Sequence, residues 1–462
     1  MVEKKPWLEE PRKYFEPYFE TMPREEIKEI QNKKLKALLE RGYNFAPSVR
    51  KLFEERKITP SDIKTTEDFQ KKIPTMFKDT VRELRSKTGD PFGGFLVIPP
   101  EKVKTVQHST GTTGVPTFIP KTDRDFEWIT REYARHAWMN GTRPGDNVLV
   151  WGYYWHAWLK DANDRGFQAC GAQVWEFSSM PTDVDIERIH GICKTVKFNG
   201  VDHGTLPFFR WMDWLRAKGL DPKKEYESEN FKFIRTEGDM IVEGLRRWSM
   251  DFWGTIHMDA SGGGDCIVSC SECPDEVLAG ETKGMHLWED LFFLEVVDLK
   301  TQEPVADGEV GQYCITPLDY EALCYPRWNY EDLVVKTSEK CVCGRTHARI
   351  LYKGRTDFGS MVKGKLITQR DAEEILYAFP EITLKPYQFI RGSKDIFVEE
   401  DTLRIRSAYD EKLTKDPEEL KKKVEAELSK KLGVPAEIEW IKPEEARALP
   451  HKVYKLFIRP KA

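Results

Sequence analysis

A run of hydroxyl-bearing residues and glycines near residue 110 points most directly to chemistry. The run consists of Ser109, Thr110, Gly111, Thr112, Thr113 and Gly114. Glycine lets backbone N–H groups approach a ligand closely, and hydroxyl groups donate further hydrogen bonds, so together they suit the phosphates of a nucleotide. No Gly-Lys-Ser/Thr sequence opens a helix here, which argues against a Walker loop. An ordinary polar loop is the alternative interpretation.

Two close pairs of cysteines have the spacing of metal ligands. Cys270 and Cys273 form one pair, Cys341 and Cys343 form the other, and His286 lies between them in the sequence. Cys₄ and Cys₃His sets are the usual tetrahedral ligands of structural zinc. No thioredoxin-like βαβ pattern surrounds the Cys-x-x-Cys sequence, so a redox role is less well supported. Free buried thiols are the alternative for these residues.

The elements that must position these residues alternate between helices and short strands. Residues 23–41 have the apolar spacing of an amphipathic helix, whereas residues 147–151 and 171–177 are short β-rich runs. Strand patterns at residues 103–107 and 116–120 flank the Ser/Thr/Gly run, which is therefore predicted to join two strands. This alternation predicts an α/β fold with layers of helices on a sheet.

The chain after Gly354 predicts a smaller α+β unit. Alternating patterns at residues 395–399 and 403–406 predict a hairpin, residues 417–432 predict a helix, and residues 436–441 predict a strand. These elements together make a compact unit of about a hundred residues, within the usual size of a domain.

The composition is that of a globular protein. The chain has 462 residues, 40% hydrophobic and 32% charged, which is enough for two or three domains. Its formal charge of −5 gives no general attraction to nucleic acid or to an anionic membrane. The start lacks the apolar segment of a secretory signal, and the nine cysteines suit reduced thiols, so a cytoplasmic location is expected.

Several motifs, in one order, identify a family. They are residues 20–27, 90–94, 284–290, 321–332, 341–347 and 354–357. On these motifs the chain resembles the adenylate-forming acyl-CoA ligases, and most closely their phenylacetate-CoA ligase branch. The resemblance implies a large multi-layered α/β domain over residues 1–354 and a small mobile α+β lid domain over residues 355–462. It also implies that ATP, with Mg²⁺, converts a carboxylic acid to an acyl-adenylate, and that CoA then takes the acyl group and AMP is released.

The resemblance assigns nucleotide contacts to several residues. Adenine and magnesium contacts are implied for Glu237, Gly238, Asp239, Ser261, Gly262 and Asp265. Asp265 stands where the family has a glutamate that helps to hold Mg²⁺, and Ser261 replaces a tyrosine that lies beside the adenine. Val115 stands where the family commonly has a lysine next to the phosphate loop, so another cation, such as Lys121, is expected to serve there.

Further roles are implied nearer the C-terminus. Asp332 corresponds to the aspartate that binds the ribose hydroxyls, and Arg355 to a second ribose or phosphate contact. Asp357 corresponds to the hinge of the lid, although Phe358 replaces a second acid that the family usually has. The lysine that contacts the carboxylate and the α-phosphate during adenylation corresponds to Lys452, with Lys455 as the alternative.

The resemblance also implies the acid pocket and the zinc ligands. Segments that line the acyl site in similar enzymes correspond here to Tyr153, Trp155 and His203, and aromatic walls suit an aryl or arylacetic acid. The implied zinc ligands are Cys273, His286, Cys341 and Cys343, with Cys270 as the substitute for His286.

Two other functions remain open from the sequence. An adenylating enzyme can pass its acyl group to an amine or a carrier protein instead of CoA, and a zinc-containing homologue can lack catalysis altogether. Release of diphosphate distinguishes the two enzymes from the non-catalytic homologue, and dependence on CoA distinguishes the CoA ligase from the enzyme with another acceptor. The expected partners are ATP, CoA and a small carboxylic acid, without nucleic acid or membrane, and a homodimer is an open alternative.

Overall fold

The computed structural model describes residues 13–109, 115–152, 157–177, 182–280, 282–382, 387–442, 445 and 456–459. The chain packs as two compact units. The first comprises residues Met1–Met240, Ser249–Tyr330 and Val335–Leu351, and the second comprises Ile241–Trp248, Glu331–Val334 and Tyr352–Ala462. In the described part of the chain, no helix has the length and apolar character needed to span a bilayer.

The main sheet has eleven strands in the order β10-β11-β12-β13-β9-β8-β7-β6-β5-β3-β4. Its strands are β3 (Asn147–Trp151), β4 (Gln173–Phe177), β5 (Gly200–Gly204), β6 (Phe233–Glu237), β7 (His257–Gly263), β8 (Val268–Ser271), β9 (Met285–His286), β10 (Phe292–Val297), β11 (Val310–Pro317), β12 (Trp328–Thr337) and β13 (Arg349–Arg355). The neighbours from β4 to β7 run parallel, whereas β8 runs antiparallel to both β7 and β9. The predicted strands at 147–151 and 171–177 are confirmed as β3 and β4.

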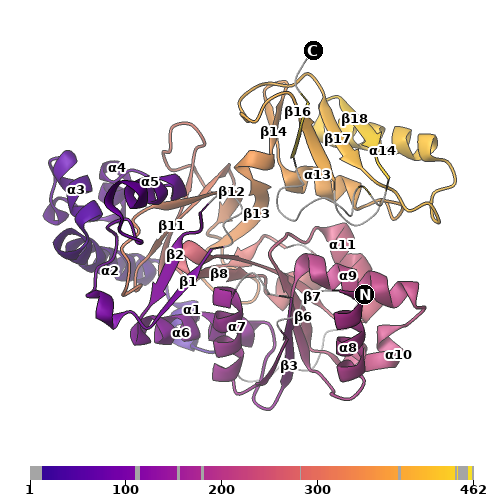
Figure 1. Ribbon diagram of the computed structural model, residues 1–462, viewed down its shortest axis with the longest axis horizontal. Helices are drawn as coiled ribbons and strands as arrows, with labels where there is room; N and C mark the ends of the chain where they lie inside the picture. The colour runs from indigo at the N-terminus through magenta and orange to yellow at the C-terminus, as the bar shows by residue number, and fades with distance from the viewer. Residues whose placement is uncertain are drawn as a thin grey trace. The chain divides into compact units, whose positions relative to one another are not determined.

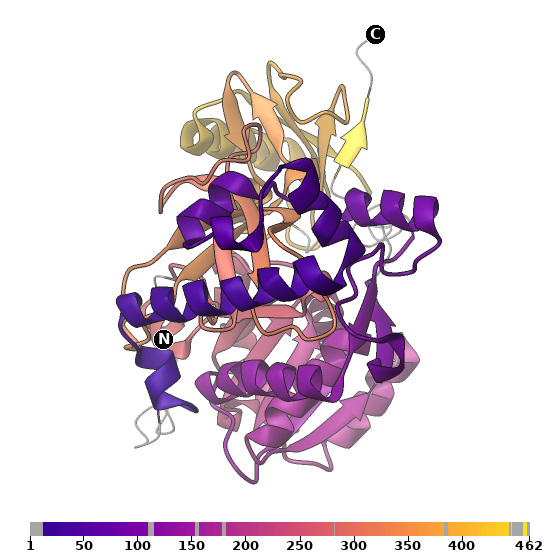
Figure 2. The same ribbon diagram turned by 90° about the vertical axis from the view of Figure 1, so that its left-hand side faces the viewer.

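Helices cover both faces of the parallel part of the sheet. Figure 1 shows α7 on one side of β3, β6 and β7, and α8 and α9 on the other side. The long helix α2, in indigo in Figure 2, confirms the amphipathic helix predicted near residue 30. The helices of the first unit are α1 (Pro17–Thr21), α2 (Arg24–Phe45), α3 (Pro47–Glu55), α4 (Thr66–Lys72), α5 (Lys78–Thr88), α6 (Asp123–Met139), α7 (Ala157–Ala169), α8 (Asp183–Cys193), α9 (Thr205–Ala217), α10 (Pro222–Tyr226) and α12 (Pro274–Ala279).

Strand β3 shows why the sequence folds into such layers. Its residues Val148, Leu149, Val150 and Trp151 are all fully buried. A strand that is covered on both faces needs an uninterrupted apolar run, and a parallel sheet with helices on both sides provides that cover.

A separate two-stranded hairpin carries the Ser/Thr/Gly run. Strands β1 (Thr105–His108) and β2 (Phe118–Lys121) pair antiparallel. Ser109 extends the ladder, since its backbone N–H donates to Thr117 O at 3.0 Å. The prediction that this run joins two strands is confirmed, and residues 110–114 themselves lie outside the described residues.

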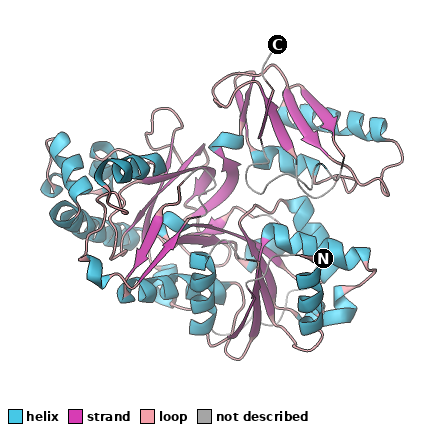
Figure 3. Ribbon diagram, in the orientation of Figure 1, coloured by secondary structure: helices cyan, strands magenta, loops and turns pink. Residues whose placement is uncertain are grey.

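The second unit has its own sheet, in the order β18-β17-β16-β19. Figure 3 shows the strands and helices of this α+β unit in magenta and cyan. Its elements are β14 (Ser360–Val362), β15 (Lys365–Ile367), α13 (Gln369–Leu376), β16 (Gln388–Arg391), β17 (Leu403–Ser407), α14 (Pro417–Leu432), β18 (Ala436–Trp440) and β19 (Leu456–Ile458). Helix α11 (Glu243–Trp253) begins in this unit and ends in the first.

The predicted hairpin in this unit is wrong in one strand. β17 pairs antiparallel with β16, whereas residues 395–399 form a turn. The Asp395 carboxylate accepts a hydrogen bond from Phe397 N at 2.9 Å, and such a local bond offers the backbone an alternative to a strand. The helix at 417–432 is confirmed, and β18 confirms the strand predicted to follow it.

Candidate active site

Three neighbouring parallel strands bring the predicted nucleotide residues of the first unit to one edge of the sheet. The register pairs Gly204 of β5 with Glu237 of β6, and Glu237 with Ala260 of β7. Ligands of open α/β sheets bind outside the carboxyl ends of parallel strands. Residues 238–239 follow the end of β6, whereas residues 261–263 continue β7 beyond its pairing with β6, pair with β8 and lead to Asp265.

Four polar side chains meet at the base of the Ser/Thr/Gly loop. The Thr117 hydroxyl donates to the Asp265 carboxylate and lies 3.0 Å from Ser109 Oγ. The Nζ atom of Lys78 lies 3.0 Å from Ser109 Oγ and 3.7 Å from Asp265 Oδ2. Ser109, Thr117 and Asp265 are buried, while about a quarter of the Lys78 side chain is exposed. The cluster therefore places one cation, one carboxylate and two hydroxyls beside a loop suited to phosphate.

Lys78, and not Lys121, is the lysine that contacts Ser109 at the base of the loop. Lys121 Nζ is buried and lies 3.2 Å from Asp161, and burial lowers the pKa of the Lys121 ammonium group. Val115, at the position where a lysine was expected, is exposed. Lys78 reaches the loop from a different element, because it is the first residue of α5.

Three glycines shape the turn that presents Asp265. A Cβ atom on Gly262 would lie 2.5 Å from Glu237 Oε1, one on Gly263 would lie 2.2 Å from the Tyr330 ring, and one on Gly264 would lie 2.9 Å from the Trp158 ring. The Tyr330 hydroxyl also accepts from Cys266 N and donates to Gly263 O, both at 3.0 Å. Glycine is required here by close approach of neighbouring side chains.

Glu237 is a buried acid with a strongly raised pKa. Burial raises the pKa of its carboxyl to about 7, although Arg235 opposes the shift with an ion pair at 3.0 Å. Arg235 also pairs with Asp202 at 2.8 Å. The Oε1 atom of Glu237 has no hydrogen-bond partner within the described residues. Such an atom is suited to meet a polar group of a ligand.

The one described residue of the predicted acid pocket, His203, lies in an aromatic core. Its ring packs 4.6 Å from Trp151 and 6.3 Å from Trp211, centroid to centroid, and has no exposed surface. Burial lowers the pKa of the imidazole to about 3, so the ring is neutral. The other two predicted pocket residues, Tyr153 and Trp155, lie outside the described residues.

The predicted ribose and hinge residues are brought together within the second unit. Arg355 Nη1 lies 3.3 Å from Asp332 Oδ1, and Arg355 Nη2 lies 3.5 Å from Asp357 Oδ2. The Tyr352 hydroxyl donates to Asp332 at 3.2 Å, and the Arg355 backbone N–H donates to Gln369 Oε1 at 2.8 Å. Lys452 and Lys455 lie outside the described residues.

The four predicted metal ligands converge in the first unit. One ligand atom from each of Cys273, His286, Cys341 and Cys343 lies within 4.8 Å of the others, and all four residues are buried. The Sγ atoms of Cys273 and Cys341 are 3.6 Å apart, and Cys343 Sγ is 3.5 Å from His286 Nε2. Hydrogen bonds from Cys273 and Cys341, together with His286, lower the pKa of the Cys343 thiol. The set has the composition of a Cys₃His site.

Cys270 lies outside this cluster. Its Sγ atom is 3.7 Å from the hydroxyl of Tyr313, and burial raises the pKa of its thiol. Since β8 ends between Cys270 and Cys273, the two cysteines have different surroundings.

Sequence reasoning missed three residues of the site: Lys78, Thr117 and Tyr330. Thr117 follows the loop directly, and Tyr330 lies inside the motif 321–332, so both carried a signal by position. Lys78 lies far from the loop in sequence, and only the packing of α5 reveals it.

The chain is similar to known CoA ligases. No protein-family model matches it. A phenylacetate-coenzyme A ligase of Thermus thermophilus is 30% identical over 384 residues, which cover 81% of this chain and 80% of that protein. A phenylacetate-coenzyme A ligase of Aromatoleum evansii is 26% identical over 434 residues, covering 92% of each.

Solved structures share the fold. A 2-hydroxyisobutyryl-CoA ligase in the postadenylation state with 2-HIB-AMP has a TM-score of 0.83 at 21% identity, covering 97% of this chain and 93% of that one. An anthranilate CoA ligase in complex with anthranoyl-AMP has a TM-score of 0.57 at 15% identity, covering 73% of this chain and 62% of that one.

Proposed function

The chain belongs to the phenylacetate-coenzyme A ligase family, and on that basis we propose that it activates an aryl or arylacetic acid. The enzyme is an AMP-forming acid–CoA ligase: ATP and the acid give an acyl-adenylate and diphosphate, and the CoA thiol then displaces AMP. The aromatic acid is suggested by the relatives, which are named for phenylacetate.

The meeting of Lys78, Ser109, Thr117 and Asp265 is the observation that carries the nucleotide assignment. When the acid carboxylate attacks the α-phosphate, negative charge grows on the phosphate oxygens and on the departing diphosphate. Lys78 supplies a positive charge beside the loop, and the Ser109 hydroxyl and the loop backbone supply donors. These groups bind the phosphates more strongly as negative charge develops, so removal of the Lys78 ammonium group or the Ser109 hydroxyl should slow the adenylation step.

Asp265 and Thr117 fit a magnesium ion. Mg²⁺ prefers oxygen ligands and is commonly bound through one or two carboxylates together with phosphates of the substrate. When bound, it would offset phosphate charge. Asp265 would then exchange its contact with Lys78 for the ion and free the ammonium group for phosphate.

We assign the ribose hydroxyls to Asp332 and adenine to Glu237. A carboxylate accepts two hydrogen bonds at once, which suits the two ribose hydroxyls. Arg355 and Tyr352 hold the Asp332 side chain in place. The Glu237 oxygen that has no partner would accept from the adenine amino group. Lys452 remains the proposed adenylation lysine and Asp357 the proposed hinge.

The Cys₃His set fits a structural zinc ion. Zinc bonds of about 2.3 Å to sulfur and about 2.05 Å to nitrogen, at tetrahedral angles, give edges of about 3.8 Å between sulfurs and about 3.6 Å between sulfur and nitrogen. The distances of 3.6 Å and 3.5 Å lie close to these edges. When bound, zinc would link the loops around Cys273 and Cys341 and stabilise the folded state.

A substrate screen tests the proposed function. Purified full-length protein is incubated with ATP, Mg²⁺ and a panel of aryl, arylacetic and aliphatic acids, with and without CoA. We expect diphosphate release that depends on an aromatic acid, and acyl-CoA formation only when CoA is present. Diphosphate release followed by transfer of the acyl group to an amine would contradict CoA as the acceptor. A preference for aliphatic acids would contradict an aryl or arylacetic acid as the substrate.

A further inference from the structure

The N-terminal segment of residues 13–24 packs over the loop that carries two of the metal ligands. The Tyr14 hydroxyl donates to the carbonyl of Cys343 at 2.9 Å. Gly344 has φ +91°, which favours glycine, and a Cβ atom there would lie 2.4 Å from the Tyr14 hydroxyl oxygen, so glycine at residue 344 leaves room for Tyr14 in this position. Lys13 also pairs with Asp275, beside the third cysteine ligand, at 3.6 Å.

The loop continues to bind the segment after the last cysteine. Thr346 donates its backbone N–H to Glu20 O at 3.3 Å and its hydroxyl to Met22 O at 2.7 Å. His347 Nε2 donates to Phe19 O at 2.6 Å, and its Nδ1 accepts from Glu289 N at 3.0 Å. Three main-chain carbonyls of the segment, those of Phe19, Glu20 and Met22, therefore accept hydrogen bonds from the two residues that follow Arg345.

Arg345 is the charged link between the segment and the metal ligands. Its Nε and Nη2 atoms both lie 2.8 Å from Glu20 Oε2. The Arg345 side chain is 2% exposed and the Glu20 side chain is fully buried. The other carboxylate oxygen of Glu20 accepts from Glu16 N at 2.8 Å. The backbone carbonyl of Arg345 accepts a hydrogen bond from Cys341 N at 3.1 Å, so Arg345 lies in the same turn as two of the cysteine ligands.

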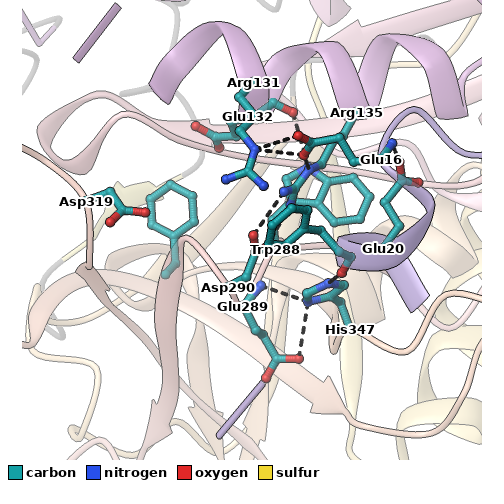
Figure 4. A network of polar contacts seen from close by, with 12 residues as sticks. Glu16, Glu20, Arg131, Glu132, Arg135, Trp288, Glu289, Asp290, Asp319 and His347 are labelled. Atoms are coloured by element: carbon teal, nitrogen blue, oxygen red, sulfur yellow. Dashed lines mark hydrogen bonds and ion pairs between the residues drawn. The ribbon is translucent and has the colours of Figure 1, made fainter. Parts of the chain in front are cut away.

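Glu16 anchors the segment to the core by a second ionic contact. Figure 4 shows its carboxylate between Arg131 and Arg135 of α6. Arg131 Nε lies 2.7 Å from Glu16, and Arg135 forms a bidentate pair with Asp290 at 2.7 and 2.9 Å. This second anchor adds to the contacts with the loop at residues 341–347 and helps to present Glu20 to Arg345.

A Cys₃His zinc centre needs such a cation. Three thiolates and Zn²⁺ sum to one negative charge, and burial of a net charge is costly unless an opposite charge or a hydrogen bond compensates it. Arg345 is a buried cation in the same turn as Cys341 and Cys343. Because Glu20 pairs with it, the pair carries no net charge, and the guanidinium group acts through its position beside the cysteines, which Glu20 fixes. Partners outside the ligand sphere commonly change metal affinity by about 10- to 100-fold.

We propose that Arg345 and Glu20 are positioning residues of the metal centre, and that zinc retention and docking of the N-terminal segment are coupled. This inference rests on the zinc centre proposed above. Coupling of binding free energies is reciprocal, so undocking the segment should weaken zinc binding, which we expect to appear as faster release, and zinc removal should loosen the segment.

Zinc release from the full-length, zinc-loaded protein tests the first half of the coupling. Release into the chromogenic chelator 4-(2-pyridylazo)resorcinol should be about 10- to 100-fold faster for Glu20→Gln and Arg345→Met than for the wild type. Tyr14→Phe, which keeps the buried charges, should show a smaller acceleration. Glu295→Gln is the matched control, because Glu295 is also fully buried and pairs with an arginine, Arg327, at 2.9 Å. It should release zinc at the wild-type rate.

Limited trypsin digestion tests the second half. Removal of zinc should accelerate cleavage after Arg24, whose side chain now pairs with Glu289 at 2.9 Å and donates to Thr346 O at 3.2 Å. Unchanged cleavage, or zinc release from Glu20→Gln equal to that from Glu295→Gln, would overturn the inference. A wild type without zinc would overturn the zinc centre as well, whereas acyl-CoA formation, assayed separately, decides the proposed function.

Discussion

Cys270 and Cys273 belong to one Cys-x-x-Cys sequence, yet their sulfur atoms have unrelated partners. Cys270 Sγ lies 3.7 Å from the Tyr313 hydroxyl, whereas Cys273 Sγ lies 3.6 Å from Cys341 Sγ. The pair therefore offers a test in which one of two neighbouring buried thiols belongs to the metal cluster and the other does not.

Elemental analysis should find close to one zinc per chain in protein purified without added metal. Cys273→Ser and Cys341→Ser should lose the metal and lower the melting temperature, because bound zinc favours the folded state. Cys270→Ser should retain it. Equal zinc loss from the Cys270 and Cys273 variants would argue against the ligand set.

Lys78→Met should slow diphosphate release about 10- to 100-fold, since a hydrogen bond to a charged group contributes about 1.5–3 kcal/mol and 1.4 kcal/mol is tenfold in rate. Thioester formation from supplied acyl-adenylate should stay near the wild-type rate. Lys87→Met, on the exposed face of the same helix α5, is the control. A Lys78→Met enzyme with wild-type diphosphate release would exclude the phosphate role.

Gly263→Ala should reduce the free energy of unfolding by about 1–3 kcal/mol, because the new methyl group overlaps the Tyr330 ring. Gly191→Ala makes the same chemical change in helix α8, where nothing lies within 4 Å, and should raise stability by about 0.5–1 kcal/mol. Urea denaturation measures both. Tyr330→Ala removes the ring that the new methyl group overlaps. The double variant Gly263→Ala/Tyr330→Ala should therefore lose less free energy of unfolding than the sum of the losses from the two single variants, and a loss equal to that sum would exclude the overlap.

Glu237 should make the enzyme less stable as the pH rises through neutrality. Its pKa is raised from 4.5 to about 7, so the folded protein holds a proton that the unfolded chain releases near pH 4.5. Stability therefore falls between about pH 4.5 and pH 7, by about 3 kcal/mol at 1.36 kcal/mol per pKa unit.

Glu237→Gln should remove this pH dependence. Compared with the wild type, the variant should gain about 3 kcal/mol of stability between pH 4.5 and pH 8 in urea denaturation. Glu339→Gln, at an exposed carboxylate, should follow the wild type. If the free energies of unfolding of Glu237→Gln and the wild type differ by the same amount at pH 4.5 and at pH 8, Glu237 does not titrate in this range.

Local patterns were sufficient to predict much of the fold. The apolar run of β3 and the spacing of α14 appear in short stretches of sequence, and both elements formed as expected. The same reasoning was wrong for residues 395–399. Their alternating pattern is compatible with a strand or a turn, and the hydrogen bond of the Asp395 side chain favours the turn.

The site was predictable where ordered motifs placed residues, and not where packing did. The four metal ligands converge from segments that the sequence had already grouped. Lys78 was missed because no periodicity in α5 indicates that its first residue faces Ser109. The ion pair between Arg345 and Glu20 was likewise not predictable, because the two residues are 325 positions apart in the sequence and only the fold brings them together.

The chain enters the second unit three times, and this limits how the protein can recombine with its relatives. A fragment that begins at Tyr352 lacks residues Ile241–Trp248 and Glu331–Val334. Within that unit Gly244 lies so close to Tyr377 that a Cβ atom would be 2.2 Å from the carbonyl oxygen, and Glu243 N donates to Glu374 at 3.2 Å. A chimera joined only at residue 351 would pair the α11 segment of one parent with the α13 segment of another. Exchange of C-terminal cassettes should therefore succeed only when the crossover carries the start of α11 with it.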